Sequence, residues 1–360
     1  MSFVPVEEQY DLSGRVWARA FDENLGSHWG EVVVMSSLTY KPLRSILITG
    51  ATGFVGRAVM NSLSESCGYL TKGVVRVGEP SAGSPIVPSI DGTTDWCTSI
   101  GGVDAVVHLA AKVQIMKGDV AEPLTAFRKV NVEGSLALAR QAAGAGVKRF
   151  VFISSIKVNG EQTLYGQRYT TDDTPNPADP YGTSKYEAEQ GLRAIAAETG
   201  MEVVIIRPVL VYGPGVKGNF LSMMRWLHKG VPLPLGAIHN LRSLVALDNL
   251  VDLIVTCLQH PEAANQTFLV SDGEDLSTTG LLQRTASAMG VKARLIPLPA
   301  SIIQTAASLL GKRDVAQRLC GSLQVDISKT HQILGWAPPV RVDQALKRTA
   351  QHFLLNRDLG

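Results

Sequence analysis

The chain has 360 residues, of which 45% are hydrophobic and 18% are charged, and its formal net charge is +2 at pH 7. These values predict a globular protein with a large core, in one domain with an embedded lobe or in two domains. A net charge near zero gives no general electrostatic basis for binding nucleic acid or membranes, and no apolar run approaches the ~20 residues that span a bilayer. The four cysteines have no CxxC spacing, so we expect neither a metal site nor a disulfide framework, and a cytoplasmic location.

The first 43 residues differ in composition from the rest of the chain. They mix charged residues and glycines with short apolar segments such as Val32–Val34, and we expect them to form an N-terminal extension. They contain no basic segment followed by an apolar one, so no secretory signal is expected. The regular pattern of a folded domain begins near residue 44.

Three glycines follow the first apolar segment of this domain, in the stretch ITGATGFVG. Ser45–Ile48 has the pattern of a buried strand, and Arg57–Leu63 has the apolar spacing of a helix. Gly50, Gly53 and Gly56 therefore occupy a strand-to-helix turn, where backbone N–H groups and the positive helix end suit a pyrophosphate. In such a site the first glycine permits the tight turn, the second lets the phosphates approach, and the third lets the helix pack on the sheet. An ordinary structural turn is the alternative.

Strand and helix patterns alternate further along the chain. Strands are predicted over 74–77, 104–109, 149–153 and 202–206, and helices over 126–145 and 181–199. This alternation predicts an α/β fold with a doubly wound parallel sheet, in which ligands bind beyond the carboxyl ends of the strands. Two further segments, 250–258 and 301–310, are apolar enough to predict buried helices.

A tyrosine and a lysine stand four residues apart at the start of the helix predicted over 181–199. This spacing places the Tyr181 phenol and the Lys185 ammonium on one helix face. A phenol has a pKa of about 10, and a cation one turn away lowers that pKa towards the working range of a proton donor or acceptor. Ser155 lies just beyond the strand at 149–153, where its hydroxyl could meet the same substrate oxygen. Such a pair also arises by chance, and its position is what favours the chemical role.

Six motifs, in a fixed order, resemble the extended short-chain dehydrogenase/reductase family. They are TGATGFVG at 49–56, HLAA at 108–111, NVEG containing Asn131, SSIKVNG at 154–160, YGTSK at 181–185 and RPVLVYGPG at 207–215. The resemblance covers residues ~44 to ~350 and implies a Rossmann-type sheet. It implies an enzyme in which Tyr181 is the acid/base, Ser155 hydrogen-bonds the substrate oxygen, and Lys185 tunes Tyr181 and holds the nicotinamide ribose.

The same resemblance implies a nicotinamide dinucleotide at the carboxyl ends of the strands. Arg76 suits a 2′-phosphate, which favours NADP(H) and leaves NAD(H) as the alternative. Ser89 departs from the family pattern, in which an aspartate precedes the apolar residue on the adenine. The implied cofactor-binding residues are Gly50, Thr52, Gly53, Phe54, Val55, Gly56, Arg76, Ile90, Leu109, Ala110, Ala111, Asn131, Tyr181, Lys185 and Pro208.

Beyond Pro208 the pattern becomes irregular and resembles the nucleotide-sugar branch of the family. The expected dinucleotide-binding domain comprises residues 44–208 and 241–271, and the expected nucleotide-sugar-binding lobe comprises 209–240 and 272–360. The resemblance implies substrate contacts from Asn219, Arg242 and Arg318, with the Arg242 guanidinium paired to the diphosphate.

Within this branch, whole stretches resemble the 4-ketoreductases that complete UDP-N-acetylquinovosamine or UDP-N-acetylfucosamine for bacterial surface polysaccharides. The resemblance implies NAD(P)H-dependent reduction of the 4-keto group of a UDP-4-keto-6-deoxy-N-acetylhexosamine. Leu323 stands where the branch gates the size of the 2-substituent and is not a tyrosine, which leans away from a strict glucose epimerase. The alternatives are a UDP-hexose or UDP-N-acetylhexosamine 4-epimerase with tightly bound NAD, and a non-catalytic dinucleotide-sensing regulator. The habit of the family further implies a homodimer, through the helices at 126–145 and 181–199.

Overall fold

Contacts divide the chain into two units, Met1–Pro42 and Leu43–Gly360. The structure, a computed structural model, describes residues 8–10, 16–22, 26–31, 45–66, 68–76, 85–114, 122–164 and 166–356. The first unit contains an antiparallel sheet of β1 (Glu8–Tyr10), β2 (Val16–Asp22) and β3 (Gly26–Glu31). These strands were not among the elements predicted for the N-terminal extension over 1–43.

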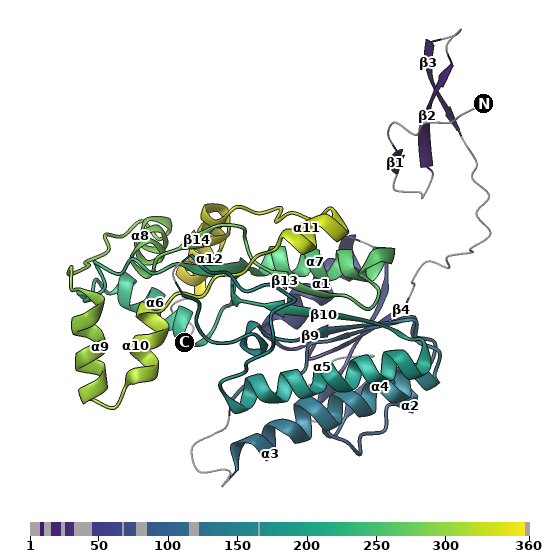
Figure 1. Cartoon of the computed structure of the whole chain (residues 1–360), viewed down its shortest axis with the longest axis horizontal. Helices are drawn as coiled ribbons and strands as arrows, with labels where there is room; N and C mark the ends of the chain where they lie inside the picture. Colours follow the sequence, from purple (N-terminus) through teal and green to yellow (C-terminus); the bar gives the residue numbers. More distant parts are fainter. Residues whose placement is uncertain are drawn as a thin grey trace. The chain divides into compact units, whose positions relative to one another are not determined.

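A six-stranded parallel sheet forms the centre of the second unit (Figure 1). Its order is β13–β10–β9–β8–β4–β5, and every neighbouring pair is parallel. The prediction of an α/β fold with a doubly wound parallel sheet is confirmed. The strands are β4 (Ser45–Thr49), β5 (Leu70–Gly73), β8 (Ala105–His108), β9 (Arg149–Ile153), β10 (Glu202–Pro208) and β13 (Thr267–Val270).

Helices cover both faces of this sheet (Figure 1). Successive side chains of β4 point to opposite faces, so Ile46 and Ile48 join one core while Leu47 joins the other. The first core is closed by α1 (Phe54–Ser66), α7 (Leu247–Gln259) and α11 (Ser328–Leu334), and the second by α2 (Cys97–Ile100), α4 (Ser135–Gly144) and α5 (Pro180–Thr199).

The second strand of the sheet lies earlier in the chain than predicted. Leu70–Gly73 forms β5 and pairs with β4, whereas Val75–Arg76 forms β6 and pairs with β7 (Ile86–Val87) outside the main sheet. The physical reason is that β5 is an edge strand, with Leu70 70% exposed. Only Gly73 of β5 is buried, and Thr71 and Lys72 interrupt the continuous apolar pattern that predicts a buried strand.

A smaller sheet lies beyond β10, in the order β11–β12–β14. β12 belongs to this sheet and not to the six-stranded one, so the segment predicted to return to the first domain at residue 241 does so only with α7 and β13. The small sheet shares a core with helices α6, α8 and α12. The bounds are β11 (Leu210–Tyr212), β12 (Arg242–Ala246), β14 (Asp275–Leu276), α6 (Gly218–His228), α8 (Thr278–Ala288) and α12 (Val342–Asn356).

Of the two apolar helices predicted to be buried, one is buried in the structure and the other is not. Residues 250–258 lie within α7 and are largely buried, as predicted. Residues 301–310 also form a helix, α9 (Ala300–Leu309), but none of its residues is buried. The prediction of burial was wrong there because α9 packs mainly on the short α10 (Arg313–Cys320), and of its described residues only Ala300 and Ile303 touch the core of the smaller lobe. Among the described residues, no helix is both long and apolar enough to cross a bilayer.

Candidate active site

The glycine turn between β4 and α1 is closed by contacts that leave no room for side chains. Gly50 has a positive φ of 69°, and a Cβ there would lie 2.9 Å from the backbone nitrogen of Ala110. A Cβ on Gly56 would lie 2.0 Å from the carbonyl oxygen of Gly50. The N–H of Gly53 donates to that same carbonyl oxygen at 2.9 Å. The glycines therefore shape a bare backbone cradle at the N-terminus of a 13-residue helix.

This cradle fits the pyrophosphate of a dinucleotide, because a phosphate needs free N–H groups and close approach to the backbone. Thr52 and Gly53 are exposed at its rim, while Phe54 and Val55 are half-buried in the first turn of α1. The neighbouring strand end contributes Leu109, Ala110 and Ala111, all half-buried. Pro208 is buried at the end of β10.

A buried histidine connects the glycine turn to the helix that carries Asn131. Ser135 donates from Oγ to the carbonyl oxygen of Asn131 at 2.7 Å, so it accepts from Nε2 of His108 at 2.8 Å. The Nδ1 atom of His108 then accepts from the hydroxyl of Thr49 at 2.6 Å. Burial lowers the pKa of His108 to about 3. His108 is therefore a neutral link in a directional hydrogen-bond chain, a role that the HLAA motif alone did not indicate.

Asn131 lies in a π-helix, η1 (Lys129–Gly134), between α3 (Pro123–Arg128) and α4, where one continuous helix was predicted. Its side chain donates to the carbonyl of Lys112 at 3.0 Å and accepts from the N–H of Lys112 at 2.8 Å. It also donates to Oγ of Ser184 at 3.0 Å, and Ser184 donates to the carbonyl of Tyr181. Asn131 thus joins the loop after β8 to the first turns of α5.

The first turn of α5 presents both residues of the predicted Tyr–Lys pair. Asp179 caps this helix by accepting from the N–H of Gly182 at 2.6 Å, and Pro180 occupies its first position. Lys185 is 1% exposed, and its ammonium lies 3.9 Å from the ring centroid of Phe152 in β9. The Tyr181 ring packs edge-on against Phe127 at 6.0 Å.

Ser155 lies at the end of β9, against the same turn of α5. It is the N-cap of the short helix η2 (Ile156–Val158), and its Oγ accepts from the N–H of Lys157 at 3.2 Å. A Cβ on Gly182 would lie only 2.8 Å from the carbonyl oxygen of Lys157, so the two backbones are in close contact. The Lys157 ammonium also forms an ion pair with Asp179. The structure therefore brings the segments that carry Ser155, Tyr181 and Lys185 into direct contact.

Burial changes the acidity of both members of the pair. It raises the pKa of Tyr181 to about 12, with Asp179 adding to the rise, and lowers the pKa of Lys185 to about 7, opposed by the charge of Glu189. The expected lowering of the tyrosine pKa by Lys185 is therefore not seen here. Desolvation disfavours the phenolate and, near neutral pH, also reduces the fraction of Lys185 that carries a charge.

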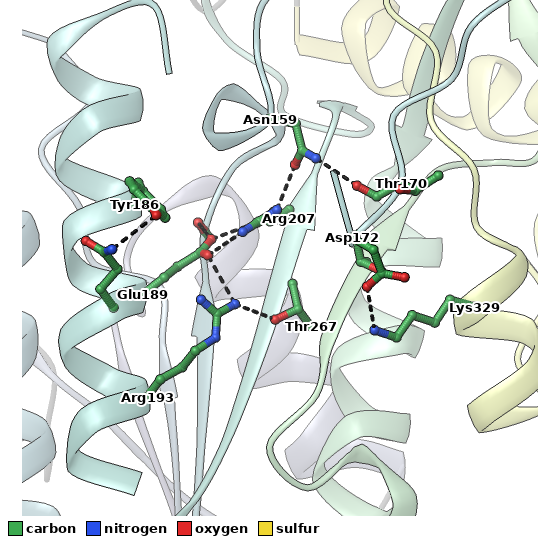
Figure 2. A network of polar contacts seen from close by, with 12 residues as sticks. Asn159, Thr170, Asp172, Tyr186, Glu189, Arg193, Arg207, Thr267 and Lys329 are labelled. Carbon is green, nitrogen blue, oxygen red and sulfur yellow. Dashed lines mark hydrogen bonds and ion pairs between the residues drawn. The ribbon is translucent and has the colours of Figure 1, made fainter. Parts of the chain in front are cut away.

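A buried carboxylate lies one helical turn beyond Lys185 (Figure 2). Glu189 is fully buried and receives two hydrogen bonds from the guanidinium of Arg207 in β10, at 2.9 and 2.6 Å. It also accepts from the hydroxyl of Ser154, next to Ser155, at 2.5 Å. Arg207 reaches further, to Oδ1 of Asn159 at 2.9 Å. The sequence analysis missed Glu189, although its spacing of four from Lys185 was a readable signal.

The remaining predicted cofactor residues are Ile90 and Arg76. Ile90 packs closely on the π-helix, where a Cβ on Gly134 would lie 2.9 Å from its Cγ2 atom. The next residue, Asp91, accepts hydrogen bonds from Ser89 and Thr93 through its carboxylate. These hydrogen bonds lower the pKa of Asp91, and those from Thr93 have the largest effect. Arg76 lies in β6, and its side chain is outside the described part of the structure.

Two of the three predicted substrate residues are neighbours. Arg242 begins β12 and donates to the carbonyl of Gly321 at 3.0 Å. Burial lowers the pKa of Arg242, and the positive charge of Arg318 in α10 lowers it further. Two guanidinium groups within electrostatic range of each other suit a polyanion such as a diphosphate. Asn219 is exposed in the first turn of another helix, α6. In the described part of the chain, no group of three or more His, Cys, Asp or Glu residues could hold a metal.

Comparison with known proteins identifies the family to which the chain belongs. The profile of the NAD dependent epimerase/dehydratase family matches residues 46–271. The chain belongs to this family. The expectation of an NAD(P)-dependent enzyme of the extended short-chain dehydrogenase/reductase type is thereby confirmed, as the Ser155, Tyr181 and Lys185 motifs had implied.

Two curated relatives match most of the chain. A protein of Vibrio cholerae named UDP-glucose 4-epimerase is 50% identical over 314 residues, which are 86% of this chain and 96% of that protein. A protein of Escherichia coli O157:H7 named N-acetyl-alpha-D-glucosaminyl-diphospho-ditrans,octacis-undecaprenol 4-epimerase is 26% identical and covers 86% of this chain and 95% of its own length.

Among solved structures, the fold matches UDP-glucose 4-epimerase of Thermotoga maritima in complex with UDP-glucose. That match has a TM-score of 0.69 at 22% identity and covers 88% of this chain and 100% of that chain. UDP-N-acetylglucosamine 4-epimerase of Bacillus cereus also has a TM-score of 0.69, at 21% identity, and covers 88% of this chain and 98% of that chain. Similarity at this level shows that the fold is shared.

We predict that Glu189→Gln lowers the free energy of unfolding by about 3–5 kcal/mol, because it leaves the buried guanidinium of Arg207 without a carboxylate. Urea denaturation followed by circular dichroism measures this loss. The control is Glu274→Gln, which breaks a 2.6 Å pair with Arg284, where the two side chains are 45% and 37% exposed. The control should lose about 1 kcal/mol or less, and equal losses would contradict the prediction.

Lys185→Met should stabilise the fold in a pH-dependent way. Because burial lowers the pKa of Lys185 from 10.5 to about 7, the unfolded chain binds a proton that the folded chain releases between these values. The destabilisation by Lys185 is therefore complete at and below pH 7 and disappears as the pH rises towards 10.5. Urea titrations at pH 7 and pH 10 should show the larger gain at pH 7. A gain independent of pH, or one shared by the exposed control Lys347→Met, would argue against it.

Proposed function

We propose that the protein is a UDP-hexose 4-epimerase that uses a nicotinamide dinucleotide. The observation that carries the proposal is the contact between the segments of Ser155, Tyr181 and Lys185, at the carboxyl ends of the strands and beside a cradle that fits a pyrophosphate. The substrate class follows from the 50% identical relative named UDP-glucose 4-epimerase and from the paired guanidinium groups of Arg242 and Arg318.

The epimerase replaces the 4-ketoreductase as the favoured reaction. The reductase reading rested on resemblance of whole stretches and on Arg76, whose side chain the structure does not describe. The relatives and structures compared above are named as 4-epimerases. UDP-N-acetylhexosamines belong to the proposed substrate range, because Leu323 is smaller than the tyrosine expected of a strict glucose enzyme.

When bound, an oxidised nicotinamide supplies an acceptor for the hydride at carbon 4 and a positive charge. The side chains of this protein transfer the proton of the 4-hydroxyl group. Tyr181 takes the proton of the 4-hydroxyl group and returns it after the sugar has presented its other face, and Ser155 hydrogen-bonds the same oxygen. Since the pKa of Tyr181 is about 12 in this structure, the phenol needs added positive charge before it acts as a base. Acid–base catalysis of this kind contributes roughly 10²–10⁴ in rate.

The proposed assembly is a homodimer through α3, α4 and α5, as the resemblance implies. The bound dinucleotide is proposed to be NAD, with NADP the outcome that Arg76 would favour. Extraction of the purified protein and chromatography of the released dinucleotide distinguish the two.

The deciding experiment incubates purified protein with UDP-glucose, and separately with UDP-N-acetylglucosamine, without added cofactor. We expect the 4-epimer of at least one of them to form, as seen by proton NMR, with no net change in absorbance at ~340 nm beyond that of bound cofactor. The reductase reading returns if neither sugar is epimerised and a UDP-4-keto-6-deoxy-N-acetylhexosamine consumes reduced cofactor stoichiometrically. A protein inactive in both assays that still binds dinucleotide would point to a regulator.

Tyr181→Phe should lower turnover by at least ~10² while dinucleotide binding stays near that of the wild type, because only the hydroxyl is removed. Ser155→Ala should lower turnover by less. Initial rates and fluorescence titration of the dinucleotide measure the two effects. Tyr181 has another role if the variant loses the dinucleotide but keeps its turnover per bound cofactor.

Arg76→Asp should weaken NADP(H) relative to NAD(H) by about tenfold or more, because a carboxylate repels a 2′-phosphate and accepts hydrogen bonds from two ribose hydroxyls. The ratio of the two dissociation constants, measured for wild type and variant, tests this. An unchanged ratio would leave Arg76 without a role in the choice of cofactor.

A further inference from the structure

Helix α9 presents apolar side chains to solvent. Leu309 is 84% exposed, Leu310 73% and Ile302 52%, and Ile296 before the helix is 47% exposed. Residues 295–311 contain no charged residue. Single exposed leucines are ordinary on a protein surface, whereas a continuous charge-free segment with several of them marks a surface that binds something.

α9 is exposed on every side except at Ala300, Ile303 and Ala307, which are half-buried, and one of its exposed faces is largely apolar. Ile302, Thr305, Ala306 and Leu309 follow the spacing of a single helix face, and all four are exposed. The hydroxyl of Thr305 already donates to the carbonyl of Ser301 at 2.9 Å, so covering this face leaves no hydroxyl donor unpaired. α10 packs on another side of α9, and the two helices project together from the smaller lobe (Figure 1).

Basic residues stand at both ends of the charge-free segment. Lys292 and Arg294 precede it, and Lys312 and Arg313 follow Leu310 directly in the turn to α10; all four are exposed. Between residues 276 and 325 the only acidic residue is Asp314. The chain's net charge of +2 therefore conceals a strongly basic local surface.

This combination identifies the occupant of the face. A second copy in a two-fold interface would bring the basic ends of the two segments towards each other, at an electrostatic cost. An anionic bilayer accepts both features, because apolar side chains enter the interface while lysine and arginine extend to lipid phosphates.

We propose that residues 292–313 dock the protein on the surface of an anionic bilayer, with α9 lying in the plane of the interface. Apolar insertion and basic attraction are two signals, the number that stable attachment to a membrane requires. Docking holds α10, and with it Arg318, near the bilayer surface. The inference is independent of the proposed epimerase activity, since none of these docking residues belongs to the predicted active site.

The test uses the full chain and sedimentation with vesicles of phosphatidylcholine alone or of phosphatidylcholine with phosphatidylglycerol. We expect the protein to bind the anionic vesicles at ~0.1 M salt. Binding to the neutral vesicles, or to the anionic vesicles at ~0.5 M salt, should be at least about tenfold weaker. Leu309→Ser with Leu310→Ser should weaken binding by about tenfold or more, and Lys312→Gln with Arg313→Gln should weaken it and flatten its salt dependence. The control Leu70→Ser removes a leucine that is 70% exposed on the six-stranded sheet and should bind like the wild type.

Circular dichroism spectra and thermal unfolding should be unchanged in the leucine and basic variants, which shows that they remain folded. The proposal is overturned if the wild type binds no vesicles, or if Leu70→Ser weakens binding as much as the α9 variants. It is also overturned if sedimentation velocity shows a wild-type oligomer that Leu309→Ser with Leu310→Ser dissociates, because a second copy then covers α9.

Discussion

The ion pair between Glu189 and Arg207 is the interaction on which the geometry of the site depends. It joins α5, which carries Tyr181 and Lys185, to β10, which lies between β13 and β9 in the sheet. The same carboxylate accepts from Ser154 at the end of β9. One buried group therefore fixes the helix and the strand end that together present the predicted chemistry.

Burying this pair has a physical logic beyond anchoring. Desolvation of a lysine as deeply buried as Lys185 strongly favours its neutral form, and a nearby carboxylate opposes that effect. The charge of Glu189 opposes the lowering of the Lys185 pKa, while the guanidinium of Arg207 donates two hydrogen bonds to the same carboxylate. A pair of this kind adds little net stability, but it makes the loss of either partner expensive. The Glu189 carboxylate therefore both affects the pKa of Lys185 in α5 and holds Ser154 at the end of β9.

The parts of the site that the sequence predicts are those encoded by short-range spacing. The glycine turn is local, and the positive φ of Gly50 and the contact of Gly56 with its carbonyl oxygen agree with the expected backbone roles. The spacing of Tyr181 and Lys185 likewise needs only a helix. What escaped prediction depends on residues far apart in the chain. The pairing of β5, the Glu189–Arg207 pair and the hydrogen bonds of His108 are set by which strands become neighbours, and no local pattern reports that.

Averages over the chain conceal the features that distinguish the smaller lobe. The apolar sequence of α9 resembles that of α7, and the two helices differ in what they pack on. α7 contributes to the core beside the six-stranded sheet, whereas α9 packs on α10 and has no buried residue. The net charge of the chain likewise conceals where its basic residues lie. Arg318 lowers the pKa of Arg242, so in the folded chain two guanidinium groups repel each other at a partly buried position. A fold tolerates such repulsion where a ligand carries the compensating charge, and a diphosphate supplies two or more negative charges that pair with both groups. The composition of the chain argues against a generally basic protein, yet its folding gathers basic residues on one lobe, where they can act on an anionic ligand and an anionic surface.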